Sequence, residues 1–181
     1  MQDDRYLTTE EAAAYLRLKE RKLYELVARG AVPCAKVTGK WLFPRAALDR
    51  WIVDNACAGI ARLPADGVIY AINVSGMSLS DDQFLAFVIG CIERYGVAPE
   101  RICFEITETV AIKDIASAQT FMGEMKACGC RFALDDFGAG MSSFAYLKTL
   151  PVDFLKIDGQ FIRHAEPLYF DSIPLMARNY K

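Results

Sequence analysis

The second half of the chain alternates apolar runs with amphipathic segments, and this alternation leaves few folds open to it. Strand-like apolar runs occupy residues 68–74, 101–108, 131–136 and 152–158. Helical spacing of apolar residues between them predicts helices over residues 81–95, about 115–128 and 143–150. The runs are continuously apolar, as expected of parallel strands that are buried on both faces. The pattern therefore indicates an α/β fold of parallel strands joined by crossover helices.

The four runs also carry polar side chains near their C-terminal ends. These side chains are Asn73, Glu105, Asp135, Asp136 and Lys156. In a β/α barrel the reactive groups lie at this end of the strands, so separate strands would bring them to one rim. Clustered carboxylates need a counter-cation, and oxygen ligands suit Mg²⁺ or Mn²⁺ better than zinc. Two such ions can activate water against a phosphodiester, and Lys156 could orient the nucleophile or neutralise phosphate charge.

Composition excludes several other kinds of site. The chain has 181 residues and one histidine, His164, so a zinc site with two histidines cannot form within it, and no GxSxG nucleophile motif is present. No apolar run approaches the roughly 18 residues of a membrane helix, and the N-terminus is too polar for a signal peptide. We therefore expect a cytoplasmic protein that does not associate with membranes. Its six cysteines are expected to be mostly buried thiols.

Residues 1–54 have a different pattern, which predicts a helix, a turn, a second helix, a hairpin and a third helix. Thr8 and Glu11 have capping-box spacing, so the first helix should begin near residue 9. The second helix is predicted over about residues 20–29, and two short strands should flank residues 38–39. Pro44 is expected in the first turn of the third helix, where proline is tolerated.

The two patterns are separated by a segment without periodicity. Residues 55–67 are rich in small side chains and are predicted to form a linker. The chain is therefore expected to comprise a domain over residues 1–54, this linker, and a second domain over residues 68–181.

Residues 7–16, 24–30 and 41–51 resemble the excisionase-type winged helix-turn-helix, which is related to the mercury-resistance regulators. The resemblance implies DNA binding, with the second helix in a major groove and the hairpin near phosphates. The implied DNA-binding residues are Lys19, Arg21, Lys22, Lys36, Lys40 and Arg45. Lys19 stands where the family often has a Ser or Thr cap worth about 1 kcal/mol. The alternative is that these basic residues form only a solvated face.

Four motifs of the second half resemble the EAL-type cyclic di-GMP phosphodiesterase domain. They are Asn-Val-Ser at 73–75, Glu-Ile-Thr-Glu at 105–108, Asp-Asp-Phe-Gly-Ala-Gly-Met-Ser-Ser at 135–143 and Lys-Ile-Asp at 156–158. The resemblance implies a modified β/α barrel that hydrolyses cyclic di-GMP with two divalent ions, Mg²⁺ or Mn²⁺. It implies metal ligation by Asn73, Glu105, Asp135 and Asp136. It further implies that Lys156 acts near the attacking water, that Glu108 supports the metal-bound loop, and that residues 137–143 couple the site to a homodimer.

The resemblance is incomplete in a way that bears on activity. The chain has no Glu-Ala-Leu tripeptide, whose glutamate is a metal ligand in the family, and it ends 25 residues after Lys156. A β/α barrel needs about 200–250 residues, so we expect residues 68–181 to form a partial, truncated TIM-like barrel with open edges. Little or no phosphodiesterase activity is expected from the isolated chain. The alternatives are a barrel completed by another copy or partner, and a non-enzymatic regulator or interaction module.

Overall fold

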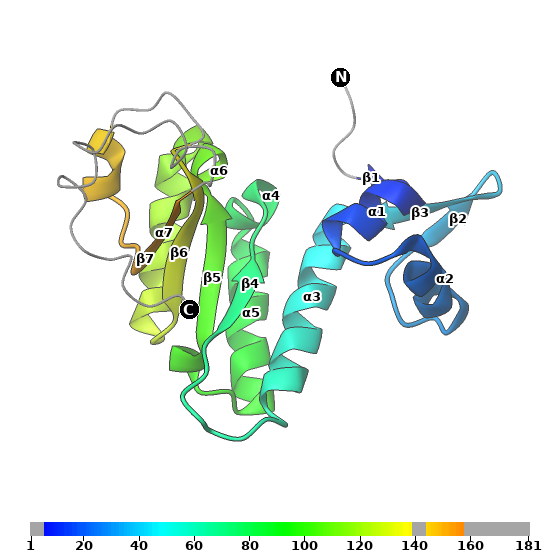
Figure 1. Ribbon diagram of the computed structural model, residues 1–181, viewed down its shortest axis with the longest axis horizontal. Coiled ribbons are helices and arrows are strands. Elements are labelled where there is room, and N and C mark those ends of the chain that lie inside the picture. Colours follow the sequence, from blue (N-terminus) through cyan, green and yellow to red (C-terminus); the bar gives the residue numbers. More distant parts are fainter. Residues whose placement is uncertain (1–5, 139–143, 158–181) are drawn as a thin grey trace. The chain divides into compact units, whose positions relative to one another are not determined.

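The computed structural model describes residues 6–138 and 144–157 (Figure 1). The chain divides into two compact units, residues 1–56 and residues 57–181, and each is described by itself. Most of the predicted dimer loop, His164 and the C-terminal segment from residue 158 lie outside the described residues. Among the helices that are described, none is both long and apolar enough to cross a membrane.

The first unit has its helices and hairpin in the predicted order, preceded by a short strand, β1 (Tyr6–Leu7), that was not predicted. The predicted elements are α1 (Thr9–Tyr15), α2 (Glu20–Ala28), β2 (Ala35–Val37), β3 (Lys40–Pro44) and the start of α3 (Arg45–Ile60). The predicted capping box is confirmed, because the Thr8 side chain accepts from the backbone of Glu11, whose side chain accepts from Thr8 in return. The antiparallel strands lie in the order β1-β3-β2, and Thr38 and Gly39 turn the hairpin with φ angles of 48° and 85°. Both angles are positive, as a tight two-residue hairpin turn requires.

A small apolar core holds this unit together. It consists of Ala12, Ala13, Leu23, Val32, Phe43 and Leu48, all buried. The helices contribute one face each, since Leu23 is the buried residue of α2 and Ala12 and Ala13 are those of α1. Asp49 is also buried and accepts a hydrogen bond from the Tyr15 hydroxyl. Burial and this carboxylate raise the pKa of Tyr15, so the tyrosine remains a neutral donor.

Two sequence-based expectations differ from the structure near the end of this unit. Pro44 is the last residue of β3, where it lies opposite Tyr6, and the helix begins only at Arg45. Proline is tolerated there because β3 pairs at this residue with β1 alone, so Pro44 does not interrupt a pairing on both sides of the strand. The predicted linker 55–67 is helical as far as Ile60, because its alanines and other small residues extend α3 without breaking it.

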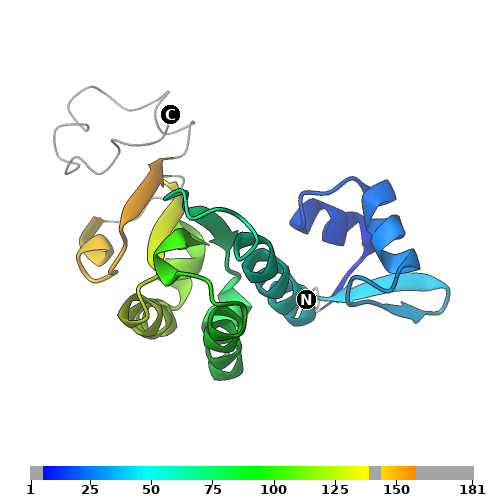
Figure 2. The ribbon, with the colours of Figure 1, turned by 90° about the horizontal axis from the view of Figure 1, so that it is seen from below.

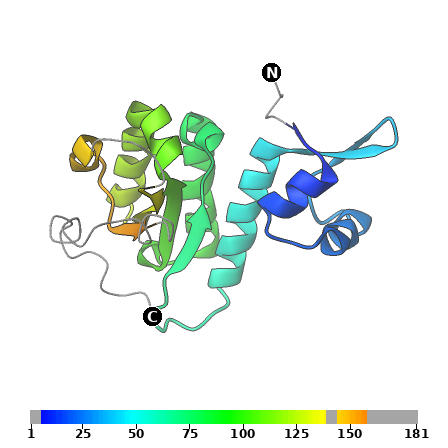
Figure 3. The same cartoon turned by 45° about the horizontal axis from the view of Figure 1, so that its top comes forward.

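The second unit is an α/β structure on a four-stranded parallel sheet, as predicted. Its strands are β4 (Tyr70–Asn73), β5 (Ile102–Thr107), β6 (Arg131–Phe137) and β7 (Phe154–Ile157), in that order across the sheet. The crossover helices α5 (Asp82–Tyr95) and α7 (Ile115–Ala127) pack on one face of the sheet, as Figure 2 shows. Figure 3 gives a further view of the strands running in the same direction. This parallel arrangement places the C-terminal ends of all four strands at one edge.

Several short elements of this unit were not predicted. They are α4 (Gly76–Leu79), α6 (Glu108–Lys113) and the 3₁₀ turns η1 (Pro99–Arg101) and η2 (Phe144–Lys148). The last of these replaces the helix that was expected over residues 143–150. Helices α4 and α6 directly follow β4 and β5, so they lie at the C-terminal end of the sheet (Figure 1).

The core between the sheet and its helices is aromatic. Phe121 of α7 lies between Phe84 of α5 and the strand residues Phe104 and Phe132, with ring centroids 5.9–6.1 Å apart. All four side chains are buried, and two of the contacts are edge-to-face. Such pairs add to the stabilisation from burial itself. The cluster therefore fixes both crossover helices against the strands that carry the polar ends.

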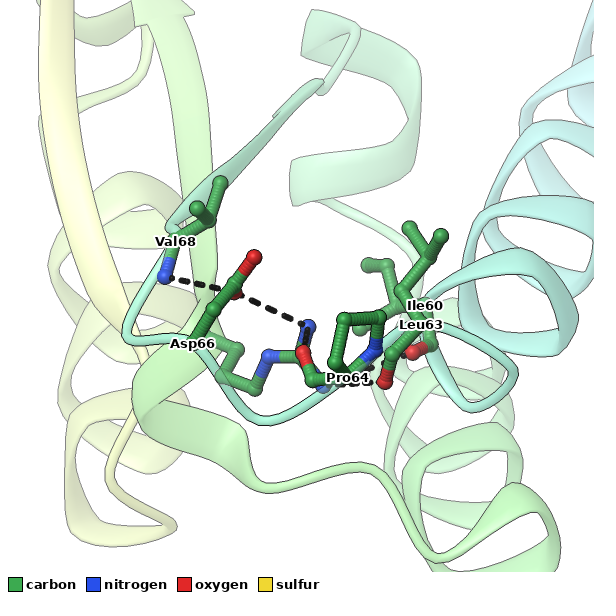
Figure 4. Close-up of polar contacts among 6 residues, drawn as sticks. Ile60, Leu63, Pro64, Asp66 and Val68 are labelled. Atoms are coloured by element: carbon green, nitrogen blue, oxygen red, sulfur yellow. Dashed lines mark hydrogen bonds and ion pairs between the residues drawn. The ribbon is translucent and has the colours of Figure 1, made fainter.

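Arg101 forms hydrogen bonds with the segment between α3 and β4 (Figure 4). Its guanidinium donates to the carbonyl oxygens of Ile60 and Leu63, each at 3.4 Å, and of Pro64 at 2.9 Å. It also lies 3.8 Å from Asp66 and 5.3 Å above the ring of Tyr70. Ile60 is the last residue of α3, and Leu63 and Pro64 follow it, so Arg101 links the C-terminal end of the helix to the segment that leads to β4.

We expect Arg101→Met to lower the free energy of unfolding of this unit by about 1–3 kcal/mol, because the largely buried guanidinium gives up its three hydrogen bonds to carbonyl oxygens. Chemical denaturation followed by circular dichroism measures the change. Arg62→Met is the matched control, since Arg62 is exposed and should change stability little. Equal stabilities of the two variants would show that the Arg101 contacts contribute nothing.

Candidate functional site

Three polar side chains lie on one face of the sheet at its C-terminal edge. Asn73 of β4 is in register with Glu105 of β5, and Thr107 of β5 is in register with Asp135 of β6. Residues in register on neighbouring strands point to the same face, as do residues two apart on one strand. Asn73, Glu105 and Asp135 therefore share a face. The predicted convergence of these three strand ends agrees with the register.

Lys156 of β7 joins the two carboxylates of this face. Its Nζ lies 2.9 Å from Glu105 Oε2 and 3.1 Å from Asp135 Oδ2. Glu105 is only 6% exposed, so its charge is compensated by Lys156 rather than by water. Burial alone would lower the pKa of Lys156, but the hydrogen bonds to Glu105 and Asp135 outweigh it and the pKa is raised. The lysine is therefore held as a cation between two acids.

Asp136 departs from this arrangement. It is exposed, and its φ of 53° lies in the left-handed region that non-glycine residues seldom adopt. The pairing of β6 with β7 shifts register between Leu134 and Phe137, on either side of the two aspartates. Bulges of this kind redirect a side chain and are common beside active sites. Asp135 and Asp136 therefore occupy different surroundings although they are adjacent in sequence.

Glu108 holds the backbone that follows β6. It is 5% exposed, and its carboxylate accepts hydrogen bonds from the Gly138 amide at 2.9 Å and from the Tyr146 hydroxyl. Burial and the carboxylate raise the pKa of Tyr146, which keeps its proton for this bond. Gly138 lies in the part of the chain before residue 139 and Tyr146 in the part after residue 143, so Glu108 links two segments that are separate in the sequence. The contact between Tyr146 and Glu108 could not be predicted from the sequence, because the two residues are 38 positions apart.

The oxygen donors of this face fit a hard divalent cation in type but form an incomplete set. Two carboxylates and one amide are ligands that Mg²⁺, Mn²⁺ or Ca²⁺ accept. In the parts of the chain that the structure describes, no three His, Cys, Asp or Glu side chains gather closely enough to hold a metal ion. Glu105 and Asp135, with Asn73 beside them, are the candidate ligands of this chain.

The basic residues of the first unit divide into two groups. Lys19, Arg21 and Lys22 line an open depression with Glu25, at the start of α2, and Lys36 and Lys40 are exposed on the hairpin. Lys36 also lies 5.4 Å from the ring centre of Trp41. Arg45 is partly buried, and its guanidinium lies 5.1 Å from the ring centre of Tyr15. Helix α2 lacks a side-chain cap at Lys19, as its sequence predicted.

Comparison with known proteins relates the chain to one family. The profile of the EAL domain matches residues 3–179. A cyclic di-GMP phosphodiesterase of Shewanella oneidensis, PdeB, is 31% identical over 156 residues, which are 80% of this chain and 18% of that protein. The chain thus spans under a fifth of the length of this curated relative.

Two solved structures are also similar. The phosphodiesterase PaMucR in complex with cyclic di-GMP is 32% identical with a TM-score of 0.58, covering 65% of this chain and 52% of that one. Klebsiella pneumoniae BlrP1, in a complex with calcium and cyclic di-GMP, is 26% identical with a TM-score of 0.57, covering 64% and 30%. The similarity to the first structure spans about half of that chain.

Proposed function

Because this chain belongs to the EAL domain family, we propose that it binds cyclic di-GMP together with a divalent cation at the C-terminal ends of β4 to β7. The observation that supports this most directly is the pairing of Glu105 and Asp135 through Lys156 on one face of the sheet. The face presents negative charge to a cation and positive charge to a phosphate within a few ångströms. A cyclic dinucleotide with two phosphodiesters matches that combination.

The proposed roles of the residues follow from their positions. Glu105 and Asp135 would hold the cation, with Asn73 adding a neutral oxygen and Asp136 reaching it from the bulge. When bound, such an ion supplies an acidified water and neutralises charge on the phosphodiester. Lys156 would meet a phosphate oxygen or orient the water, and Glu108 would keep the loop between Gly138 and Tyr146 in place.

We propose that hydrolysis by this chain is slow or absent. The sequence has no Glu-Ala-Leu tripeptide, so the acidic ligands implied by the family are fewer here. Phosphodiester cleavage with two metal ions requires a complete ligand set for both, because each ion stabilises a different oxygen. Binding needs less than catalysis, since a single ion and a lysine already attract the phosphates.

Titration calorimetry with cyclic di-GMP and Mn²⁺, with chromatographic detection of the linear dinucleotide, tests this proposal. We expect saturable binding of cyclic di-GMP that requires Mn²⁺ and is lost with a chelator, and little product. Cyclic di-AMP serves as the control ligand for base recognition. Rapid hydrolysis abolished by a chelator would contradict the proposed impairment, and no binding of cyclic di-GMP would contradict the function itself.

A second proposal concerns the first unit, which we propose binds DNA through α2 and the β2–β3 hairpin. It is supported by the exposed cations Lys19, Arg21 and Lys22 at the N-terminal end of α2, and by Lys36 and Lys40 on the hairpin. A short helix whose first turn is basic can enter a major groove while a hairpin contacts the backbone. Arg45 contributes less to such a surface, because it lies against Tyr15.

A gel-shift series on mixed-sequence duplexes at several salt concentrations tests this proposal. The double variant Arg21→Ala/Lys22→Ala should weaken binding and flatten its salt dependence, because each lost phosphate contact lowers the slope. Arg29→Ala, at the other end of α2 and also exposed, is the control. Binding that is absent, or unchanged by the double variant, would leave these residues as a solvated face. A chain that binds DNA but not cyclic di-GMP would instead be a non-enzymatic regulator.

A further inference from the structure

Lys156 is paired with the carboxylate oxygens that would bind a cation at this site. Its ammonium group contacts Glu105 Oε2 at 2.9 Å and Asp135 Oδ2 at 3.1 Å. The three groups come from three neighbouring strands, so Lys156 of β7 extends over β6 to reach β5. The sheet thus places one positive charge between both candidate carboxylate ligands.

The two carboxylates need a neighbouring positive charge because they are largely buried. The side chain of Glu105 is 7% exposed and that of Asp135 is 16% exposed, whereas that of Lys156 is 32% exposed. A buried carboxylate without a partner is strongly destabilising, and two neighbouring ones repel each other. Lys156, with the most exposed side chain of the three, has the easiest access to solvent.

We propose that Lys156 is a resident counter-ion, which stabilises the sheet edge while no divalent cation is bound and withdraws from the carboxylates when one binds. This inference rests on the proposed function. A cation bound to the same two oxygens would lie about 2.0–2.6 Å from each, within a few ångströms of the ammonium group. Two positive charges at that separation repel each other strongly in a partly buried site.

Cation binding is therefore linked to movement of Lys156. A site whose binding-competent state is only a fraction of the population has a weaker apparent affinity by that fraction. The lysine makes the site respond to cation concentration: at low concentration the ion pair holds, and at high concentration the cation replaces it. Once displaced, the side chain is free to meet an anionic ligand such as a phosphate.

Calorimetric titration of the full chain with Mn²⁺ alone tests this inference. We expect Lys156→Met to bind Mn²⁺ about tenfold more tightly than the unmodified chain, because the competing charge is gone. Lys126→Met is the matched control, since Lys126 pairs with Asp153 at 2.5 Å and has a similar exposure of 33%. That variant removes the same charge without touching Glu105 or Asp135, and its Mn²⁺ affinity should not change.

Urea unfolding gives a readout that does not depend on the ligand. With a chelator present, Lys156→Met should unfold at a lower urea concentration than the unmodified chain. Mn²⁺ should raise the urea midpoint of Lys156→Met by more than it raises that of the unmodified chain. Glu105→Gln/Lys156→Met should recover part of the midpoint in chelator, because the more buried of the two unpaired carboxylates is gone. If Lys156→Met folds only with Mn²⁺, the same conclusion follows.

The outcomes separate this inference from the proposed function. Equal Mn²⁺ affinities of the unmodified chain and Lys156→Met would contradict the counter-ion role and leave the cation site intact. No Mn²⁺ binding by either protein would contradict both. A midpoint in chelator that Lys156→Met does not lower would show that the carboxylates do not depend on the lysine.

Discussion

Phe121→Ala is expected to lower the free energy of unfolding of the second unit by about 3–5 kcal/mol, the range for removing a buried aromatic ring. Phe121 is 2% exposed and touches the rings of Phe84, Phe104 and Phe132. Alanine would leave a cavity between α7, α5 and the two central strands. Domains are stable by only about 5–15 kcal/mol, so this single change removes a large share.

Hydrogen exchange of the backbone amides measures this effect in the intact chain. Both tryptophans, Trp41 and Trp51, lie in the first unit, so their fluorescence would not report on the second. Amides of β5 should exchange faster in Phe121→Ala, because exchange of core amides follows the unfolding free energy. Leu63→Ala is the control, since Leu63 is 45% exposed and should shift exchange little. Protection of β5 equal to that of the unmodified chain would mean that the aromatic cluster does not hold this unit together.

Glu105→Ala is expected to weaken Mn²⁺-dependent binding of cyclic di-GMP by about 100-fold or more, since even groups outside the ligand shell commonly contribute 10–100-fold to metal affinity. Glu105 is the more buried of the two carboxylates and stands between Asn73 and Asp135 on the sheet. Its loss removes a ligand and leaves Asp135 alone with Lys156. That pair is electrically neutral and has little attraction for a cation.

Glu124→Ala is the matched control for this prediction. Glu124 is an exposed acid of α7, so its removal changes the net charge equally without altering the site. Calorimetry of both variants, with circular dichroism to verify folding, gives the comparison. Retention of affinity by Glu105→Ala would remove Glu105 from the proposed ligand set.

Much of the second unit could be predicted because its signals are local. The apolar run over residues 101–108 corresponds to a strand at Ile102–Thr107, and the amphipathic pattern over 81–95 to a helix at Asp82–Tyr95. Alternation of such elements specifies parallel strands, and parallel strands align their C-terminal ends. The common face of Glu105 and Asp135 follows from that rule without any knowledge of side-chain contacts.

The features that could not be predicted depend on contacts between distant residues or on backbone conformation. The Tyr146 partner of Glu108 and the carbonyl partners of Arg101 lie about 40 residues away, so no periodic pattern carries them. The left-handed φ of Asp136 coincides with a register shift in the pairing of β6 with β7, and no pattern in the sequence of the strand marks that position. Arg45 was among the predicted DNA-binding residues, and its guanidinium lies over the ring of Tyr15, because arginine cations also stack on aromatic faces.

Paramagnetic broadening by Mn²⁺ in the amide spectrum of the full chain tests most directly whether these strand ends form a cation pocket. At substoichiometric Mn²⁺, signals of residues at the C-terminal ends of the strands, such as Asn73, Ile106, Asp135 and Ile157, should broaden and then recover with chelator. Signals at the opposite end of the sheet, such as that of Ile102, should keep their intensity. Broadening centred elsewhere, or spread evenly over the acidic surface, would contradict a pocket built by Glu105 and Asp135.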